Sequence, residues 1–151
     1  MKIKMLAVVG LLAIGVLAFT LITPTGQAEK TKVTVHKSSS CGCCGLHSRY
    51  LEQQGFSVGV NEMPDVTPIK DEMGIPTHLR SCHTAVIGDY YIEGHMPIEA
   101  INKLMAEKPD VAGIALPGMP SGSPGMPGSK QGEFVIYSIN KDGTSQEFLK
   151  I

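Results

Sequence analysis

The sequence has no excess of basic residues. It contains 13 Lys and Arg against 14 Asp and Glu. Without Lys2 and Lys4, which belong to a separate N-terminal segment, 11 basic residues remain against 14 acidic ones, a balance of −3. A nucleic-acid-binding domain normally carries a basic patch or stripe. We therefore expect no nucleic-acid partner.

The sequence also lacks the length for two ordinary domains, and it has no structural repeat. The two Pro-Gly-Met-Pro units at 117–120 and 124–127 are too short to form one. Residues 29–151 are long enough for one compact domain with a modest hydrophobic core. We therefore expect a single domain.

Residues 1–28 have the layout of a secretory signal. Two lysines precede an apolar segment from Met5 to Ile22, and Ala28 is a small residue suited to cleavage. The apolar segment is also about long enough to span a bilayer, so an uncleaved membrane anchor is the alternative. No cysteine lies near the boundary, which argues against a lipid anchor. Either way, 29–151 is expected in the periplasm, free or anchored to the inner membrane.

Three of the four cysteines, Cys41, Cys43 and Cys44, lie within four positions. Four cysteines in a small exported chain would by default indicate two disulfides. The clustering argues against that default, because adjacent cysteines rarely bridge each other without strain. Closely spaced thiols suit redox exchange or soft-metal binding. Cys82 would complete a four-sulfur site if the fold returns it to the cluster.

The order of predicted elements indicates an α/β domain with a mixed sheet flanked by helices. The cysteines lie at the start of a predicted helix, where the helix dipole favours thiolate over thiol. This order resembles the thioredoxin-like fold, and the sequence Ile75-Pro76-Thr77 resembles its cis-proline loop. The predicted strands are 32–36, 56–60, 84–87 and 90–93, and the predicted helices are 43–54, 69–73 and 98–107.

Two further segments follow the last predicted helix. Residues 113–129 are rich in Gly, Pro, Ser and Met, which predicts an irregular loop. Residues 132–149 form two β-prone runs around Lys141-Asp142-Gly143, which predicts a C-terminal hairpin. The hairpin either extends the sheet or lies apart from it.

Imidazole and thioether groups lie near the cysteines in sequence or in flexible segments. The first turn of the predicted helix carries His47, and His83 follows Cys82. Thioether sulfur binds Cu(I) without deprotonation, which suits a methionine-bearing loop over the site. For His36 and His78 a solvated side chain is the simpler interpretation. The candidate helper ligands are His47, His83, His95, Met96, Met119 and Met126.

Four motifs follow one another along the chain: Ser39-Ser40-Cys41-Gly42-Cys43-Cys44-Gly45, Ser81-Cys82-His83-Thr84-Ala85-Val86, Glu93-Gly94-His95-Met96-Pro97, and the Gly/Pro/Met-rich run 113–126. Together and in this order they resemble the CopG-type copper resistance proteins, a small exported metal-binding family. The resemblance covers about 33–126 and implies a thioredoxin-like fold, a location outside the cytoplasmic membrane, and a role in copper redox handling. It also implies copper bound through Cys41, Cys43, Cys44 and Cys82. The hairpin lies beyond it.

We therefore predict an exported copper-binding protein that holds Cu(I), in a thiolate-bridged cluster of more than one ion. Its expected partners are copper ions and other periplasmic copper-handling or redox proteins. The rival hypothesis is a thiol-disulfide oxidoreductase with Cys41 as nucleophile and Cys44 as resolving thiol. Cys43 discriminates between the two, because a dithiol enzyme needs no third thiol between its pair. A disulfide-stapled binding module is a third hypothesis.

Overall fold

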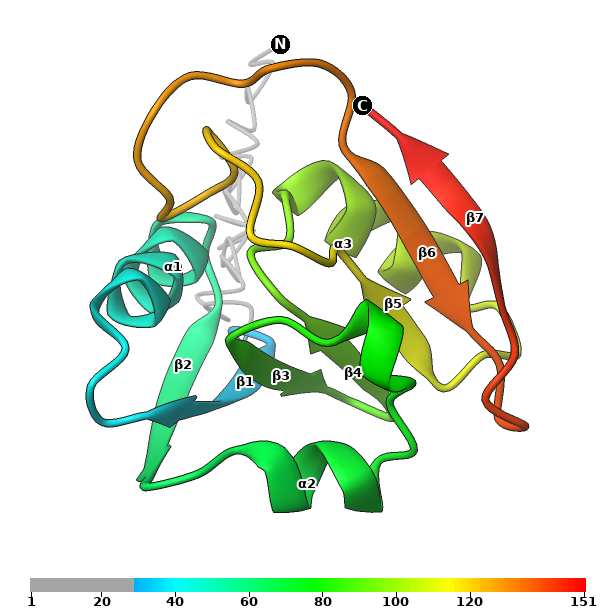
Figure 1. Cartoon of the computed structure of the whole chain (residues 1–151), viewed down its shortest axis with the longest axis horizontal. Helices are drawn as coiled ribbons and strands as arrows, with labels where there is room; N and C mark the ends of the chain where they lie inside the picture. The colour runs from blue at the N-terminus through cyan, green and yellow to red at the C-terminus, as the bar shows by residue number, and fades with distance from the viewer. Residues whose placement is uncertain (1–28) are drawn as a thin grey trace, which may run out of the picture.

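The computed structural model describes residues 29–151, so the predicted signal or anchor segment 1–28 lies outside the described residues. Seven strands form one mixed sheet in the order β2-β1-β3-β4-β5-β6-β7 (Figure 1). The strands are β1 Lys32–Ser38, β2 Ser57–Met63, β3 His83–Ile87, β4 Tyr90–Glu93, β5 Gly113–Ala115, β6 Val135–Ile139 and β7 Ser145–Lys150, and the helices are α1 Gly42–Gln53, α2 Thr67–Glu72, η1 Thr77–Leu79 and α3 Ile98–Glu107.

The predicted α/β class is confirmed, and the first four strands are compatible with a thioredoxin-like fold. Strand β1 pairs in parallel with β2 and antiparallel with β3, which forms a hairpin with β4. Val33 and Val35 are buried on alternate positions of β1, because successive strand residues point to opposite faces. Gly88 has a φ of +54° in the β3–β4 turn, a conformation that favours glycine.

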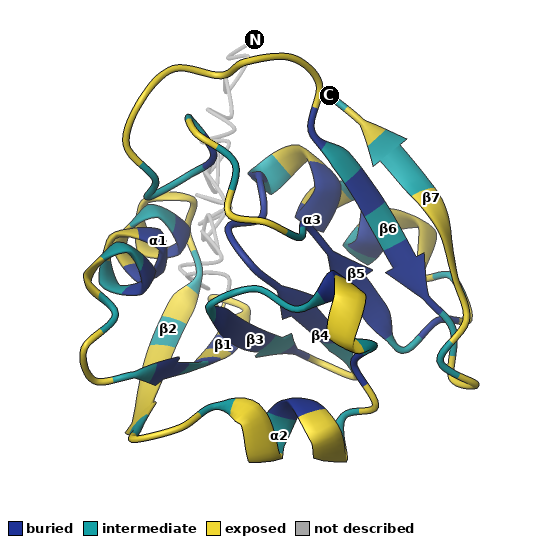
Figure 2. Cartoon of the chain, in the orientation of Figure 1, coloured by how far each residue is buried: buried dark blue, intermediate teal, exposed yellow. Residues whose placement is uncertain are grey.

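Each face of the sheet has its own hydrophobic core. Helices α1 and α3 cover one face with a cluster that includes Leu51, Ile101 and Ile92. The other face packs under η1 and the end of α2, with a smaller cluster that includes Tyr91. Tyr91 and Ile92 are successive residues of β4 and so belong to opposite faces. The central strands are buried, whereas the outer side of α2 is exposed (Figure 2).

The segment 113–129 is not irregular throughout, because its first three residues form β5. This strand pairs in parallel with β4 and antiparallel with β6, so it joins the C-terminal hairpin to the main sheet. A three-residue strand buried on both faces shows no alternation that sequence analysis could detect. The predicted hairpin is confirmed as β6 and β7, and it extends the sheet.

The loop around Pro76 differs from the sequence-based expectation. All described peptide bonds are trans, so Ile75-Pro76-Thr77 is not a cis-proline loop. Pro76 instead precedes the short helix η1, which suits its fixed backbone angle.

Among residues 29–151, no helix combines the length and apolar character needed to cross a membrane.

Candidate metal centre

The N-cap and first turn of α1 present three cysteines to the site. The backbone N–H of Cys41 donates to Ser38 O at 3.0 Å, which closes the turn that leads into the helix. Cys41 and Cys44 form a disulfide, with their Cα atoms 5.4 Å apart. The prediction of four thiolate ligands therefore requires that this disulfide be reduced. The pairing is also the one that the rival oxidoreductase hypothesis uses.

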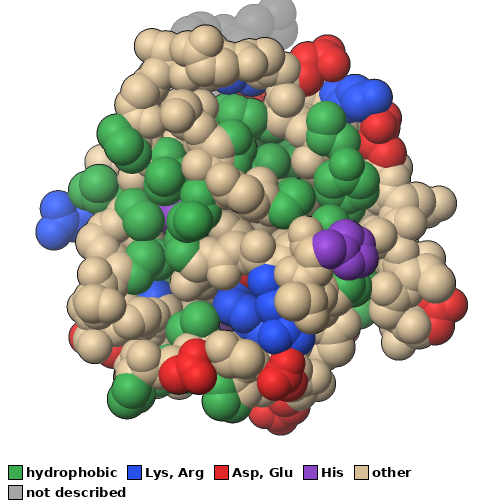
Figure 3. Space-filling view, in the orientation of Figure 1, with side chains coloured by type: hydrophobic (Ala, Val, Ile, Leu, Met, Phe, Trp, Pro, Cys, Tyr) green, Lys and Arg blue, Asp and Glu red, His purple; other side chains and the backbone are tan. Residues whose placement is uncertain are grey.

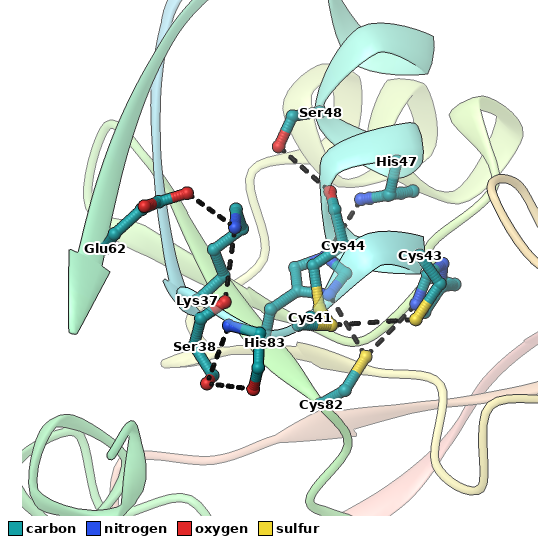
Figure 4. Close-up of a disulfide and its surroundings, with 12 residues drawn as sticks. Lys37, Ser38, Cys41, Cys43, Cys44, His47, Ser48, Glu62, Cys82 and His83 are labelled. Carbon is teal, nitrogen blue, oxygen red and sulfur yellow. Dashed lines mark hydrogen bonds and ion pairs between the residues drawn. A yellow bond between two sulfur atoms is a disulfide. The ribbon is translucent and has the colours of Figure 1, made fainter. Parts of the chain in front are cut away.

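Cys43 and Cys82 are free, half-buried cysteines. Cys43 Sγ lies 3.6 Å from Cys41 Sγ. Cys82 immediately precedes β3, and the pairing of β3 with β1 returns it to the start of α1. All four sulfur atoms lie within 4.8 Å of one another (Figure 4). The fold thus assembles the four-sulfur group that the sequence suggested.

A second group of donors overlaps the first. It comprises Cys44, Cys82, His83 and His95, whose ligand atoms also lie within 4.8 Å of one another. Cys82 Sγ is 3.1 Å from Nε2 of His95 and 3.4 Å from Nδ1 of His83. Cys44 and Cys82 belong to both groups. The centre therefore has a sulfur-only side and a mixed sulfur and imidazole side.

Hydrogen bonds fix the tautomers of the three site histidines when the rings are neutral. His47 Nε2 lies 3.1 Å from the carbonyl oxygen of Met96, which can only accept, so this nitrogen carries the proton. His47 Nδ1 then accepts from Nε2 of His83 at 2.9 Å. His95 Nδ1 donates to Pro124 O at 2.7 Å. His83 Nδ1 and His95 Nε2 therefore keep free lone pairs beside Cys82.

Burial keeps these imidazoles neutral. Desolvation lowers the pKa of His47 to about 4 and that of His83 well below its usual value, and neighbouring positive charges add to the latter effect. Burial also lowers the pKa of His95. Burial, followed by the neighbouring Cys43, raises the pKa of Cys82 to about 11. Without a cation the thiol of Cys82 is therefore protonated at neutral pH.

A buried polar network supports the segment that carries Cys82 and His83. Glu93 accepts hydrogen bonds from Lys70, the hydroxyl of Thr84 and the backbone N–H of Ser81. This network was not predictable from the sequence. Lys70 lies in a short polar helix and Glu93 ends a strand, and neither position carries a pattern that indicates burial.

The predicted methionine ligands lie in three different environments. The Met96 side chain is fully buried in the larger core, and it is the Met96 carbonyl that serves the site through His47. Met126 and Cys43 line the same surface groove of 690 Å³, together with Leu46 and Arg49. Met119 is 41% exposed.

Apolar side chains gather in the upper half of the face shown in Figure 3.

The other two histidines lie outside both donor groups. His36 Nδ1 is 3.2 Å from the side-chain amide nitrogen of Asn61, on the β1–β2 edge. His78 is exposed in η1. The fold brings His83 and His95 together with the cysteines. His47 contacts His83 instead, and both of its ring nitrogens are hydrogen-bonded, one to the Met96 carbonyl and one to His83.

Fold and site together define a mixed α/β domain with a candidate metal centre built from thiols and imidazoles. Residues 79–126 match a family model described as "Protein of unknown function, DUF411". Two solved structures of copper resistance protein CopG, Form 2 and Form 1, are each 36% identical to this chain and cover 82% of it. Their TM-scores are 0.76 and 0.75, and the matches span 99% and 98% of those chains. The chain belongs to the CopG copper resistance protein family.

A search of curated proteins found no match. The resemblance drawn from the four sequence motifs is confirmed by the structural relatives, which cover most of the chain.

Proposed function

We propose that this protein is an exported copper-binding protein of copper resistance, which holds Cu(I) through its reduced cysteine cluster. One observation carries the proposal: four sulfur atoms, three from the N-terminus of α1 with its N-cap and one from the residue before β3, lie within 4.8 Å of one another. The names of the structural relatives support the part of the proposal that concerns copper resistance. The signal-like segment 1–28 supports export, so copper would be bound outside the cytoplasmic membrane.

The donor set fits Cu(I) better than other common metals. Thiolates are soft ligands that select soft cations such as Cu(I). Structural zinc sites normally use two paired-cysteine or histidine knuckles, whereas here three cysteines share one turn at the start of α1 and the fourth, Cys82, is the residue before β3. Sulfur atoms this close can each contact two ions. We therefore propose a bridged cluster with more than one Cu(I).

The Cys41–Cys44 pair gives the cluster a redox couple. Opening the disulfide takes up two electrons and two protons and yields two thiols. Closing it from the thiols releases the same two electrons, which suffice to reduce two Cu(II) ions to Cu(I). The proposed role therefore includes cycling of the copper oxidation state. Reduction of the disulfide, and delivery or removal of copper, would involve other periplasmic redox or copper-handling proteins.

A thiol-disulfide oxidoreductase is the second candidate, because a C-x-x-C disulfide lies at a helix N-terminus. The side chain of Cys41 makes no capping hydrogen bond to the helix. Cys41 is half-buried, whereas Cys44 is fully buried. This is the asymmetry expected for an attacking thiol and its resolving partner. This function predicts turnover of disulfide substrates by the metal-free protein.

The deciding experiment measures Cu(I) bound to the reduced protein under anaerobic conditions, in competition with a Cu(I) chelator. Cys43→Ser and Cys82→Ser are expected to reduce the number of bound Cu(I) ions, and Ser39→Ala in the exposed preceding turn is the control. Copper loading equal to the parent in both cysteine variants would refute the cluster. Disulfide turnover that survives in Cys43→Ser but is lost in Cys41→Ala would favour the oxidoreductase.

A further inference from the structure

We propose that Cys82, His83 and His95 form a separate three-donor copper site that persists while the Cys41–Cys44 disulfide is closed, with His47 as its positioning residue. The inference rests on the proposed copper-binding function and deepens it. It assigns a distinct ligand set to the oxidised protein. The disulfide state would then set how many copper ions the protein holds.

The sulfur of Cys82 already lies at nearly the distance from each imidazole nitrogen that one shared ion requires. A metal bound at about 2.3 Å from sulfur and about 2.0 Å from nitrogen, with tetrahedral angles, separates those two donors by about 3.6 Å. The observed separations are 3.1 Å from Cys82 Sγ to His95 Nε2 and 3.4 Å to His83 Nδ1. A few tenths of an ångström of expansion therefore suffices. The thiol proton is displaced when the ion binds.

This set does not need the disulfide sulfurs. Closing the Cys41–Cys44 bond removes two thiolates from the four-sulfur group and leaves only Cys43 and Cys82 there. From the mixed group it removes only Cys44, while Cys82, His83 and His95 keep their donor atoms. The mixed side of the centre is therefore the one that survives oxidation.

The free lone pairs of both imidazoles are set by groups that do not bind metal. His47 accepts from His83 Nε2 and thereby leaves His83 Nδ1 unprotonated beside Cys82. His47 itself is held by the carbonyl of Met96, so neither of its nitrogens is free for a metal. The carbonyl of Pro124 accepts a hydrogen bond from His95 Nδ1, which leaves His95 Nε2 unprotonated beside Cys82. Such outer contacts orient metal-binding histidines and commonly contribute 10- to 100-fold in affinity.

One thiolate and two imidazoles define a different ligand class from a thiolate cluster. Two histidines with one cysteine are typical of copper sites that accept both Cu(I) and Cu(II), whereas all-thiolate sets select Cu(I). The oxidised protein is therefore expected to retain one copper ion, and the reduced protein several.

The test uses Co(II), which binds thiolate and imidazole without oxidising thiols, added to the full-length protein with the disulfide closed. We expect one Co(II) per chain, with a sulfur-to-cobalt charge-transfer band and the visible bands of a four-coordinate ion. Cys82→Ser and His95→Ala should abolish that spectrum, whereas His78→Ala, in the exposed η1 helix, should leave it unchanged. A closed-disulfide parent that shows no charge-transfer band would overturn the inference. So would a band that persists in Cys82→Ser, since Cys43 would then be the ligand.

The positioning role of His47 has its own readout. His47→Gln keeps one donor and one acceptor, whereas His47→Leu keeps neither. We expect Co(II) affinity to fall by about 10- to 100-fold in His47→Leu with partial recovery in His47→Gln, while circular dichroism shows both variants folded. Equal affinity in the parent and in folded His47→Leu would contradict the role. If His47→Leu does not fold, the contrast between His47→Gln and the parent decides, with a shifted cobalt spectrum expected.

Failure of this inference is distinguishable from failure of the proposed function. Several Cu(I) ions in the reduced protein, with no Co(II) in the closed protein, would overturn the three-donor site alone. Absence of cysteine-dependent Cu(I) from the reduced protein would overturn the proposed function, whatever the closed protein binds.

Discussion

The ammonium group of Lys70 lies 2.5 Å from Oε1 of Glu93, and their side chains are 4% and 0% exposed. Burial raises the pKa of Glu93, while Lys70 and the hydrogen bonds to its carboxylate oppose that rise. The same carboxylate holds Ser81 and Thr84. These two residues flank Cys82 and His83, so the ion pair fixes the segment that brings a sulfur and an imidazole to the site.

Removing only one partner of this ion pair should destabilise the protein strongly. Lys70→Met leaves the Glu93 carboxylate buried without its counter-charge, and losses of about 3 to 5 kcal/mol are typical of that situation. Denaturant unfolding of the disulfide-closed protein measures the loss. The double variant Lys70→Met, Glu93→Leu should recover only part of it. It removes the unpaired buried charge, but the backbone N–H of Ser81 and the hydroxyl of Thr84 then lose their acceptor.

The matched control for Lys70→Met is an exposed ion pair. Lys150 and Glu147 have half-exposed side chains, and Glu147→Gln is expected to change the free energy of unfolding by less than about 1 kcal/mol. If Lys70→Met cost no more than Glu147→Gln, the buried network would not support the site as described.

The buried hydroxyl of Tyr91 leads us to expect that the stability of the protein falls at alkaline pH. Its hydroxyl is buried without a hydrogen-bond partner among the described residues, and burial followed by the nearby Glu93 raises its pKa to about 12. The folded state thus holds this proton more tightly than the unfolded state, whose pKa is about 10. Its contribution to stability is complete below pH 10 and is lost as the pH rises toward 12. Tyr91→Phe should flatten that decline in thermal or denaturant unfolding.

At neutral pH Tyr91→Phe should be neutral or should stabilise the protein by about 1 kcal/mol, because it removes an unsatisfied buried hydroxyl. The neighbouring Tyr90 is the control. Its hydroxyl donates to Pro109 O at 2.9 Å, so Tyr90→Phe is expected to cost about 1 kcal/mol. A larger loss for Tyr91→Phe than for Tyr90→Phe would contradict this account.

Thiol labelling should report the disulfide state directly. Native protein without reductant should take up two alkyl groups, on Cys43 and Cys82, and reduced protein four after unfolding. Because burial raises the pKa of Cys82 to about 11, its labelling rate should still increase between pH 9 and pH 11. Mass spectrometry of peptides measures both quantities. Four labelled cysteines in native, unreduced protein would show that the disulfide does not form.

The main helices and strands were predictable from the sequence because their periodicity is local. The alternation of Val33 and Val35, the turn at Gly88 and the apolar face of α3 each lie within one short window. The clustered cysteines were visible for the same reason. The three-residue strand β5 was missed, since it is defined by its neighbours β4 and β6 rather than by its own sequence.

The finer structure of the site depends on contacts that no local pattern contains. His47 was a candidate ligand because it follows Cys44 by one helical turn, yet its position relative to His83 depends on how α1 packs against β3. Met96 follows His95 directly, but the chain directs its side chain into the core and its carbonyl toward His47. Hydrogen bonds to backbone carbonyls, such as the one that His95 donates to Pro124, cannot be assigned from residue type.

Gly125 tests whether the Gly/Pro/Met-rich loop is held against α1. It has a φ of +82°, and an added Cβ would lie 2.7 Å from the backbone nitrogen of His47 and 3.0 Å from the carbonyl oxygen of Cys43. Gly125→Ala must therefore push the loop away from the first turn of the helix. Because the adjacent Pro124 carbonyl holds His95, we expect loss of stability together with weaker metal binding at the imidazole side of the site.

The substitution Gly118→Ala, in the same segment, separates the two causes of that loss, which are backbone strain and the contact of the added Cβ with α1. Its φ of +78° imposes a similar backbone cost on alanine, about 1 kcal/mol, but an added Cβ would meet no atom within 4 Å. The difference in unfolding free energy between Gly125→Ala and Gly118→Ala therefore isolates the contact between the loop and α1. Equal losses, with Co(II) binding unchanged in both variants, would mean that the loop does not orient His95. A larger loss for Gly125→Ala with a weakened cobalt spectrum would show that this loop is part of the metal centre.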